Sequence, residues 1–427
     1  MSCALVTPPA RPRLPRRDVA VSELWRPAAE WELQSMIAKL TREKRGIEVV
    51  GHGALRNTGR AVKADIVLTT SGLKGVTLYE PTELVMSARA GTPLYEIEAV
   101  LAARGQMLAF EPVDLGPTTG APGGALSIGG VFATNFSGPR RIAAGSARDN
   151  LLGVRAVNGR GELFKSGGRV MKNVTGIDVA RGLTGSWGTL AVMTEVTFKV
   201  APIPQTMQTL AFAGLPDDLA IEALNVAMAT PLEVSGAVHL PKNCADRIRT
   251  PKLRSIGQSL TLLRLETFAA AIDTRREKLK AALKVYGTPV ELDSEESFSL
   301  WSEFRSLAMM PFSTETSLWR ISALPTKAAD IVFAIQKFMG AVAFYDWSGG
   351  LIWLEVPAAA DAGAADVRRA VAVRGGHATL IRAEPDVRGN VDVFEPLRPE
   401  VERLTRGIKS AFDPSGLLNR GRMYANF

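Results

Sequence analysis

The sequence predicts an α+β protein with two domains. Three observations support this fold class. The chain has 427 residues, more than a single hydrophobic core usually organises. In residues 21–200, short apolar strands and glycine turns alternate with amphipathic helices. The segment "APIPQT", residues 201–206, interrupts this pattern, and a second series of helices and strands follows it.

The first domain, residues 21–202, has the clearest periodicity. Apolar residues recur with helical spacing in residues 28–44, and this helix is expected to end near Gly46. A second helix follows Pro93 and is expected to end at Gly105. The predicted strands are 47–50, 66–68, 84–90, 152–157, 163–165 and 190–200, and the fourth and fifth form a hairpin across "NGRG".

The second domain, residues 203–395, is predicted to be an α/β cap over the first. Its predicted helices are 217–230 and 266–285, and its predicted strands are 207–213, 234–240, 259–264, 317–323 and 350–356. Residues 375–380, "GGHATL", are interpreted as a turn. A helix near 398–412 begins the C-terminal segment, residues 396–427, which is expected to return to the first domain.

Composition restricts the class of protein. Hydrophobic residues make up 46% and charged residues 22% of the chain, as in folded globular proteins. The net charge of +8 favours acidic partners, but basic and aromatic residues do not alternate as they do in nucleic-acid platforms, so no nucleic acid is expected. Part of the charge lies in residues 1–20, an arginine- and proline-rich stretch that we expect to be a disordered tail or an attachment arm.

Cysteine usage and hydropathy indicate the compartment. The two cysteines, Cys3 and Cys244, are too few and too far apart for a disulfide framework or a metal cluster, which fits a reducing environment. No uninterrupted apolar run has the length of a membrane span. We therefore expect a cytoplasmic protein with no metal site and at most a peripheral association with the membrane.

Three glycine-bearing segments carry the functional signal: residues 49–59 ("VVGHGALRNTG"), 116–141 and 167–196. The first is neither a dinucleotide fingerprint nor a P-loop, because it lacks the third glycine and the Gly-Lys-Ser/Thr ending. Glycine is costly to fix, so such clusters usually form tight turns or let a ligand approach the backbone. Taken singly, each segment could equally be a mobile loop.

Taken in order, the three segments resemble the FAD-binding domain of the vanillyl-alcohol oxidase flavoproteins, also called the PCMH fold. The first segment is similar to the pyrophosphate loop of that family. The second is similar to its "T-x-G-G-x-x-A-x-N-x-x-G" run, and "GSARDN", residues 145–150, to the step that follows it. The resemblance implies a two-subdomain FAD-binding domain in residues 21–202, and backbone amides in glycine turns suit a diphosphate.

The resemblance assigns FAD contacts, or the turns that permit them, to a set of residues in these segments and near the C-terminus. They are Gly51, His52, Gly53, Ala54, Gly123, Gly124, Ser127, Gly129, Gly130, Thr134, Asn135, Gly138, Gly145, Ser146, Arg148, Asp149, Lys172, Gly176, Asp178, Gly185, Gly188, Val192 and Asn419. Members with covalent flavin carry a histidine where this chain has Ala54, so the resemblance implies non-covalent FAD. His52 is equally well explained as a loop histidine bonded to backbone.

A more specific resemblance is to the FAD-binding E subunits of bacterial glycolate oxidase, and it extends from residue 22 to residue 427. "LWRIS" (318–322), "GGHATLIRA" (375–383) and "FDPSGLLNRGRMY" (412–424) belong to it. It implies oxidation of glycolate or a similar 2-hydroxy acid within a complex that contains a D-type flavoprotein subunit and an iron–sulfur subunit. The chain itself has too few cysteines to hold a cluster.

Such a reaction needs a cation for the carboxylate and a base for the hydroxyl proton. Arg320, Arg382 and Arg422 are the candidates for the cation, because a guanidinium matches a carboxylate. His377, flanked by two glycines, is the candidate base. A salt bridge for each arginine and a buried structural role for His377 are equally open interpretations.

One departure from the wider family leaves the role of the subunit open. The catalytic D-2-hydroxyacid dehydrogenases carry the motifs "H-x-G-D-G-N-x-H" and "E-H-G", and this chain, with three histidines, has neither. The subunit therefore either oxidises the substrate or relays electrons while a sibling subunit binds it. A reductase of UDP-sugar enoyl groups and a scaffold without flavin are further alternatives.

Overall fold

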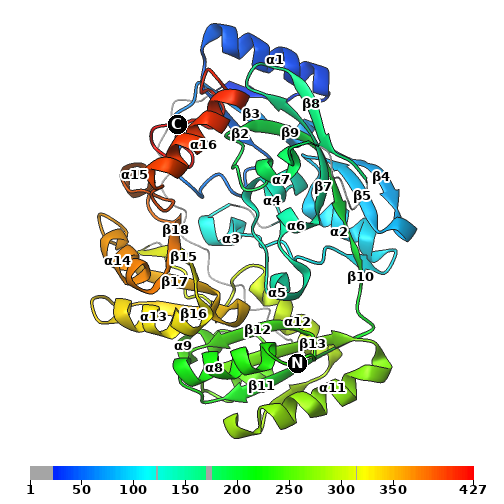
Figure 1. Ribbon diagram of the computed structural model, residues 1–427, viewed down its shortest axis with the longest axis vertical. Coiled ribbons are helices and arrows are strands. Elements are labelled where there is room, and N and C mark those ends of the chain that lie inside the picture. Colours follow the sequence, from blue (N-terminus) through cyan, green and yellow to red (C-terminus); the bar gives the residue numbers. More distant parts are fainter. Residues whose placement is uncertain (1–22, 122–123, 170–175, 314) are drawn as a thin grey trace, which may run out of the picture.

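The computed structural model describes residues 23–121, 124–169, 176–313 and 315–427. In Figure 1 the first domain forms the upper half of the molecule and the cap domain the lower half. Gly123 and Lys172, two of the predicted FAD residues, lie outside the described residues. Among the described helices, none is long and apolar enough to cross a bilayer.

Two sheets build the first domain. The smaller is parallel, with the order β1 (Glu23–Trp25), β3 (Ile66–Thr69), β2 (Ile47–Val50). The larger is antiparallel, with the order β4 (Val76–Glu80), β5 (Val85–Arg89), β9 (Ala191–Lys199), β7 (Leu151–Asn158), β8 (Leu163–Gly167). A two-stranded pair joins β6 (Gln106–Met107) to β10 (Ala201–Pro202) where the chain leaves for the cap.

Helices cover both sheets through the apolar faces that the sequence predicts. Helix α1 (Glu30–Glu43) buries Leu33, Ile37 and Leu40 against the parallel sheet and β7. Helices α2 (Leu94–Ala102) and α4 (Ile128–Thr134) share a second core with the larger sheet. The short helices α3 (Gly116–Thr119), α5 (Arg141–Ala144), α6 (Ala147–Asn150) and α7 (Val179–Leu183) complete this domain.

The cap is one antiparallel sheet of eight strands. Its order is β14 (Val290–Leu292), β11 (Thr206–Ala213), β13 (Leu260–Thr267), β12 (Val234–Leu240), β16 (Val342–Asp346), β17 (Leu351–Pro357), β15 (Thr316–Ala323), β18 (Gly376–Arg382). Alternate residues of each strand point to opposite faces, so the sheet has two distinct sides.

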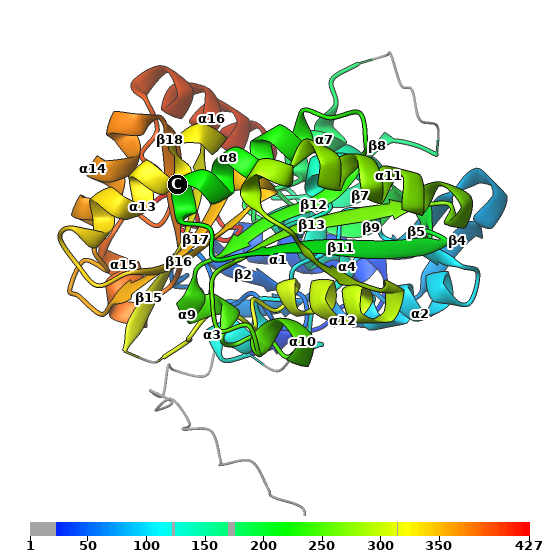
Figure 2. The ribbon, with the colours of Figure 1, turned by 90° about the horizontal axis from the view of Figure 1, so that it is seen from below.

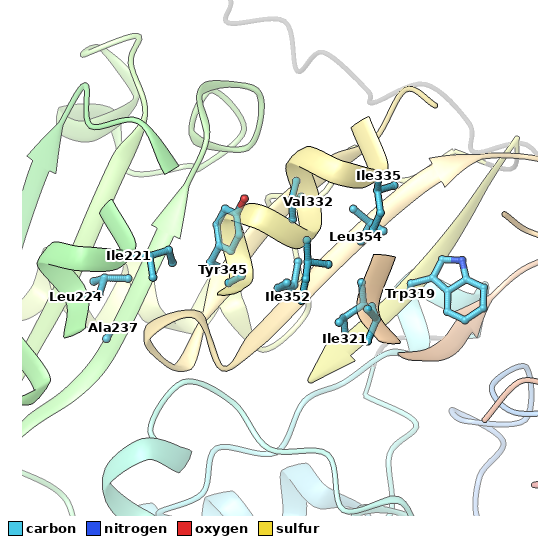
Figure 3. Close-up of a cluster of buried hydrophobic side chains, with 14 of the residues drawn as sticks. Ile221, Leu224, Ala237, Trp319, Ile321, Val332, Ile335, Tyr345, Ile352 and Leu354 are labelled. Atoms are coloured by element: carbon cyan, nitrogen blue, oxygen red, sulfur yellow. The ribbon is translucent and has the colours of Figure 1, made fainter. Parts of the chain in front are cut away.

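The two sides of the cap sheet pack differently. One side buries a core under α8 (Asp217–Met228), α11 (Ala269–Ala282), α13 (Ala328–Gln336) and α14 (Ala364–Arg374); Figure 3 shows part of it, with Trp319 and Ile352 among the side chains drawn. The other side packs on α9 (Lys242–Ala245), α10 (Pro251–Arg254) and α12 (Ser294–Phe304), which Figure 2 shows opposite α8 and α11. That second cluster also contains Phe136 and Trp187, so it joins the cap to the first domain.

The C-terminal segment lies on the first domain. After α15 (Pro385–Asn390) comes helix α16 (Pro399–Phe412), which Figure 1 shows in the upper half of the molecule. The buried Lys409 ammonium donates to Asp413 (2.7 Å) and to the carbonyls of Thr189 (2.6 Å) and Leu418 (3.0 Å). Leu418 forms a parallel bridge with Ile47, which places the last residues next to the first glycine loop.

Two details of the sequence interpretation are wrong. "GGHATL" is not a turn: residues 376–382 form β18, because they pair with residues 318–323 of β15. The predicted helix 266–285 begins only at Ala269, since β13 continues to Thr267 in pairing with β11.

Candidate functional site

A cleft in the first domain collects the predicted glycine segments. It encloses about 750 Å³, open solvent at its mouth included. Every lining residue comes from residues 49–193 or from residues 419–422. The cleft is therefore built by the first domain and the C-terminal segment, and no described residue of the cap lines it.

Many of the predicted FAD residues line this cleft. They are Gly51, His52, Gly53, Ala54, Ser127, Gly129, Gly130, Thr134, Gly188, Val192 and Asn419. The loop after β2, the start of α4, the turn before β9 and the C-terminal segment bring them together, although they are up to 368 residues apart in sequence (419 − 51 = 368).

The first glycine loop presents unused backbone donors. Among the described residues, no group accepts a hydrogen bond from the backbone N–H of residues 52, 53, 54 or 55. Consecutive free amides of this kind form a concave anion site. The loop is held from behind, because the Thr69 hydroxyl donates to the Gly51 carbonyl at 2.6 Å.

Glycines at the cleft serve two different purposes. A Cβ at Gly51 would lie 2.3 Å from Ser127 Oγ, and one at Gly129 would lie 2.7 Å from the Ala90 carbonyl oxygen, so these two allow protein segments to approach each other. A Cβ at Gly53 would meet no protein atom within 4 Å, and one at Gly130 would make only ordinary contacts, the nearest at 3.4 Å. Gly53 and Gly130 therefore leave free space on the cleft side, as a cofactor lying on backbone requires.

Other predicted FAD residues stabilise turns away from the cleft wall. Ser146 and Asp149 form a capping box at α6, and Arg148 N–H donates to Asn135 Oδ1 at 2.9 Å. Asp178 caps α7. The remaining residues of this group, which do not line the cleft, are Gly124, Gly138, Gly145, Gly176 and Gly185.

The sequence interpretation missed most of the apolar part of the wall and the cation Arg56, and it assigned Arg422 to the substrate carboxylate and not to this cleft. Val49, Val50, Leu55, Thr70, Ala90, Ala125, Leu126, Ala133, Ala191 and Met193 line the cleft, as do Trp187, Arg56 and Arg422. Trp187 has a positive φ of 57° and follows the "TGS" turn. In the sequence, an aromatic residue within this glycine turn could have predicted that Trp187 forms part of the cleft wall or stacks on a ring.

Arg422 belongs to the cofactor cleft. Its guanidinium donates to the carbonyls of Arg56 (3.0 Å) and Arg60 (3.2 Å) and lies 3.7 Å from Glu48. Burial lowers the pKa of Arg422 to about 10, a value that still leaves it charged at neutral pH. Its position beside Glu48 and the loop indicates that it supports the anion site and does not hold a substrate in the cap.

His52 and Asn419 fix the edges of the cleft. His52 Nε2 lies 2.8 Å from the Gly91 carbonyl oxygen, so its ring bonds to backbone. Asn419 accepts a hydrogen bond from Val49 N–H (2.8 Å) and donates one to the Trp187 carbonyl (2.7 Å). Asn419 thus joins the first loop, the tryptophan turn and the C-terminal segment at one point.

The three catalytic candidates of the cap have different surroundings. Arg382 donates to Glu355 (3.0 Å) and to the Thr316 hydroxyl (2.7 Å), so its charge is already paired within the sheet. His377 is exposed. Desolvation of its ring and then the Arg320 charge lower the pKa of His377, which keeps it neutral at physiological pH.

Arg320 is the unpaired cation of this group. No carboxylate or carbonyl among the described residues accepts a hydrogen bond from its side chain. Its guanidinium lies over the rings of Trp347 (5.2 Å to the centroid) and Phe136 (5.9 Å). Burial, and then the nearby charge of Arg141, lower the pKa of Arg320 to about 10.

Phe136 connects this cation to the cleft. Its ring stands edge-on to Trp187 with 5.6 Å between centroids, and Trp187 lines the cleft. Arg320 and the cleft are therefore on opposite sides of one aromatic wall. A partly buried charged group that is not hydrogen-bonded to an acidic side chain is a candidate for binding an anion.

The residues present fit FAD. The free amides of residues 52–55 suit a diphosphate, the space at Gly53 and Gly130 admits a ligand against the backbone, and the apolar wall with Trp187 suits a planar ring. Together with a parallel and an antiparallel sheet under a single-sheet cap, this cleft defines an FAD-linked oxidoreductase with a PCMH-type fold.

Comparisons with known proteins agree. The FAD binding domain family matches residues 22–167. Glycolate oxidase subunit GlcE of Escherichia coli (strain K12) is 31% identical over 92% of this chain and 97% of its own length, and glycolate oxidase subunit GlcD of Bacillus subtilis (strain 168) is 27% identical over 70% of this chain and 68% of its own. p-Cresol methylhydroxylase has the same fold, with a TM-score of 0.71 at 13% identity over 94% of this chain and 88% of that one.

The chain belongs to the family of the FAD-binding E subunits of bacterial glycolate oxidase. It is a flavin-dependent oxidoreductase, and FAD is its cofactor. The predictions of family, fold class and cofactor are confirmed.

Proposed function

We propose that this chain is the FAD-binding subunit of a complex that oxidises glycolate, or a similarly short 2-hydroxy acid, to the 2-oxo acid. The observation that carries the proposal is Arg320, a partly buried guanidinium to which no acidic side chain among the described residues is hydrogen-bonded, and which contacts the Phe136 ring that packs on Trp187 of the cleft. The similarity to subunits named for glycolate oxidase supports the same substrate class.

Arg320 suits the carboxylate of such a substrate. A guanidinium donates two parallel hydrogen bonds to a carboxylate, which fixes both its position and its plane. Strand β15 makes the placement rigid, because it lies between β17 and β18 in the cap sheet. Arg382, which pairs with Glu355, has no free charge for this purpose.

FAD, when bound, accepts the two electrons and the α-hydrogen that leave the substrate carbon. The chain has to supply the remaining parts: a carboxylate site, an acceptor for the hydroxyl proton, and exclusion of water. His377 is one candidate acceptor, since its lowered pKa keeps the ring neutral, but it is exposed. We propose that FAD is held non-covalently, because Ala54 stands where covalent members of the fold carry a histidine.

Electrons would then pass to an iron–sulfur subunit, with a D-type flavoprotein subunit as the second partner. The sequence resemblance supports both partners. The described residues bring no cap residue into the wall of the cleft, and this supports the second candidate function, in which this subunit relays electrons while the D-type subunit binds the substrate.

Anaerobic mixing of the purified, FAD-loaded chain with glycolate distinguishes the two functions. Bleaching of the flavin bands by glycolate alone supports direct oxidation. Bleaching only in the presence of the sibling subunits supports the relay. Colourless protein that does not take up FAD would contradict both.

A further inference from the structure

A second ionisable group lies on the same face of the cap sheet as Arg320. Asp346 ends β16 and pairs with Leu351, Leu351 pairs with Ser322, and Ser322 pairs with His377. Residues directly opposite each other in antiparallel strands point to the same face. Ser322 is two residues beyond Arg320, so this face carries the guanidinium and, on either flank, Asp346 and His377.

The Asp346 carboxyl is buried and only partly bonded. The residue is 3% exposed. Its Oδ1 accepts the Trp347 backbone N–H at 2.6 Å, and no described residue donates to its Oδ2. The charges that face it are Arg320 from β15, Arg141 from α5, Arg264 from β13 and Glu111 from the loop before α3.

The turn after Asp346 is strained. Trp347 and Ser348 have φ values of 53° and 59°, and Gly349 follows at 95°. Two successive non-glycine residues in the left-handed region cost free energy, and such strain is found where a side chain must be held in a set position. Here the strained residue is the tryptophan next to the carboxyl, and its Nε1 donates to the Gly138 carbonyl at 3.0 Å.

Two arginine side chains, Arg141 and Arg320, lie over the Trp347 indole ring next to Asp346. Arg141 lies 4.2 Å and Arg320 5.2 Å from its ring centroid. Within the described part of the chain, neither side chain donates a hydrogen bond to a protein acceptor. Two unpaired guanidiniums on one indole, beside a buried carboxyl, form a site for a small anion that carries a proton to be removed.

We propose that Asp346 accepts the hydroxyl proton of a 2-hydroxy acid whose carboxylate is held by Arg320 and Arg141. The inference rests on the proposed function and goes further by assigning the acceptor and the second cation. The substrate O–H bond breaks and its proton goes to Asp346 Oδ2. The O–H electron pair becomes the second bond of the carbonyl as the α C–H bond breaks, and FAD, when bound, would take up the α-hydrogen with its two electrons.

Asp346 suits this step better than His377. Water competes for the exposed His377, whereas the buried Asp346 is shielded from bulk water. Burial raises the pKa of Asp346 to about 7, and a general base is most effective when its pKa is near the working pH. The carboxylate form is lost as the pH falls below that value, so the step is expected to slow toward acid.

The test uses FAD-loaded protein, together with the sibling subunits if reduction requires them, and follows the rate of flavin reduction by glycolate from pH 5.5 to 9. We expect an acidic limb with a midpoint near 7 in the wild type. Asp346→Asn should slow reduction by at least about 100-fold at pH 8 and remove the limb, whereas His377→Gln should keep it. Asp330→Asn, an exposed residue on α13, is the matched control and should behave as the wild type.

Binding of oxalate, measured by its perturbation of the flavin spectrum, separates this inference from the proposed function. Asp346→Asn should change the affinity for oxalate less than threefold, and Arg141→Ala should weaken it at least tenfold. Asp346→Ala, with formate supplied to restore the carboxylate, replaces Asp346→Asn if that variant does not fold. Wild-type rates in Asp346→Asn, or an acidic limb that disappears only in His377→Gln, would overturn the inference while leaving the function intact. A wild type that neither binds oxalate nor is reduced by glycolate would overturn both.

Discussion

Replacing Gly53 by alanine should weaken FAD binding in addition to destabilising the fold. Gly53 has a φ of 91°, so any side chain there is strained, at a cost of about 1–2 kcal/mol. A Cβ at this position meets no protein atom within 4 Å, because it points into the space that the cleft reserves for its ligand. The backbone strain lowers the free energy of unfolding, and the loss of space in the cleft lowers the affinity for FAD. We expect the dissociation constant for FAD to rise at least tenfold, about 1.4 kcal/mol.

Gly75 provides a matched control. Its φ is 114°, a Cβ there would also meet nothing within 4 Å, and the residue does not line the cleft. Gly75→Ala should therefore show a similar loss in urea unfolding without FAD and a normal affinity for FAD. Titration of both apoproteins with FAD, followed by flavin fluorescence, gives the comparison. Equal FAD affinities for the two variants would refute the assignment of Gly53 to the cofactor cradle.

Three further predictions follow from the same geometry. Gly130→Leu should yield folded but colourless protein, since the longer side chain would occupy the cleft; full FAD occupancy by absorbance would count against this placement. Arg320→Ala should lose at least 100-fold in glycolate oxidation by the complex and keep FAD, and Arg320→Lys should recover little of it because a single ammonium lacks the fork. The pKa of Glu266, buried beside Arg264 and Arg140, is lowered to about 2. Its carboxylate therefore stabilises the fold above about pH 4.3 and loses this contribution, on the order of 3 kcal/mol, as the pH falls from 4.3 toward 2; Glu266→Gln should flatten the dependence of urea unfolding on pH in that range.

Local patterns predicted the fold well where one element carries its own signal. The face of Leu33, Ile37 and Leu40 identified α1, and the "NGRG" hairpin identified β7 and β8. Short strands such as β4, β16 and β18 gave no comparable signal, because their identity depends on the partner strand. β18 is the clearest case, since Gly375 and Gly376 are typical of a turn, and only the pairing of the residues from Gly376 onward with β15 makes this segment a strand.

The site divides in the same way. A glycine in the sequence indicates that another group lies close to the backbone, but it does not identify that group. In the structure a Cβ at Gly51 or Gly129 would collide with protein atoms, whereas one at Gly53 or Gly130 would not. The proposed role of Arg320 depends on the lack of a hydrogen-bond acceptor for its guanidinium among the described residues, which only the three-dimensional structure can show. Asp346 carried no motif at all and became a candidate through strand register.

The rings of Phe136 and Trp187 and the ion pairs between the two domains limit how the cap can move relative to the cleft. Glu111 of the first domain bonds the fully buried Arg264 of the cap at 2.8 and 3.1 Å, and Arg140 bonds Glu266 at 2.7 and 3.0 Å. Breaking a buried pair of this kind usually costs about 3–5 kcal/mol, so large rotations of the cap against the first domain are strongly disfavoured. A substrate held by Arg320 therefore reaches the flavin only through a local movement of Phe136 and Trp187, whereas in the relay function these rings stay in place and electrons pass across them. If this subunit oxidises the substrate, Phe136→Ala should alter the rate at which glycolate reduces the flavin. If it relays electrons, glycolate alone should not reduce the flavin of this variant, and only the rate of electron transfer between subunits should change.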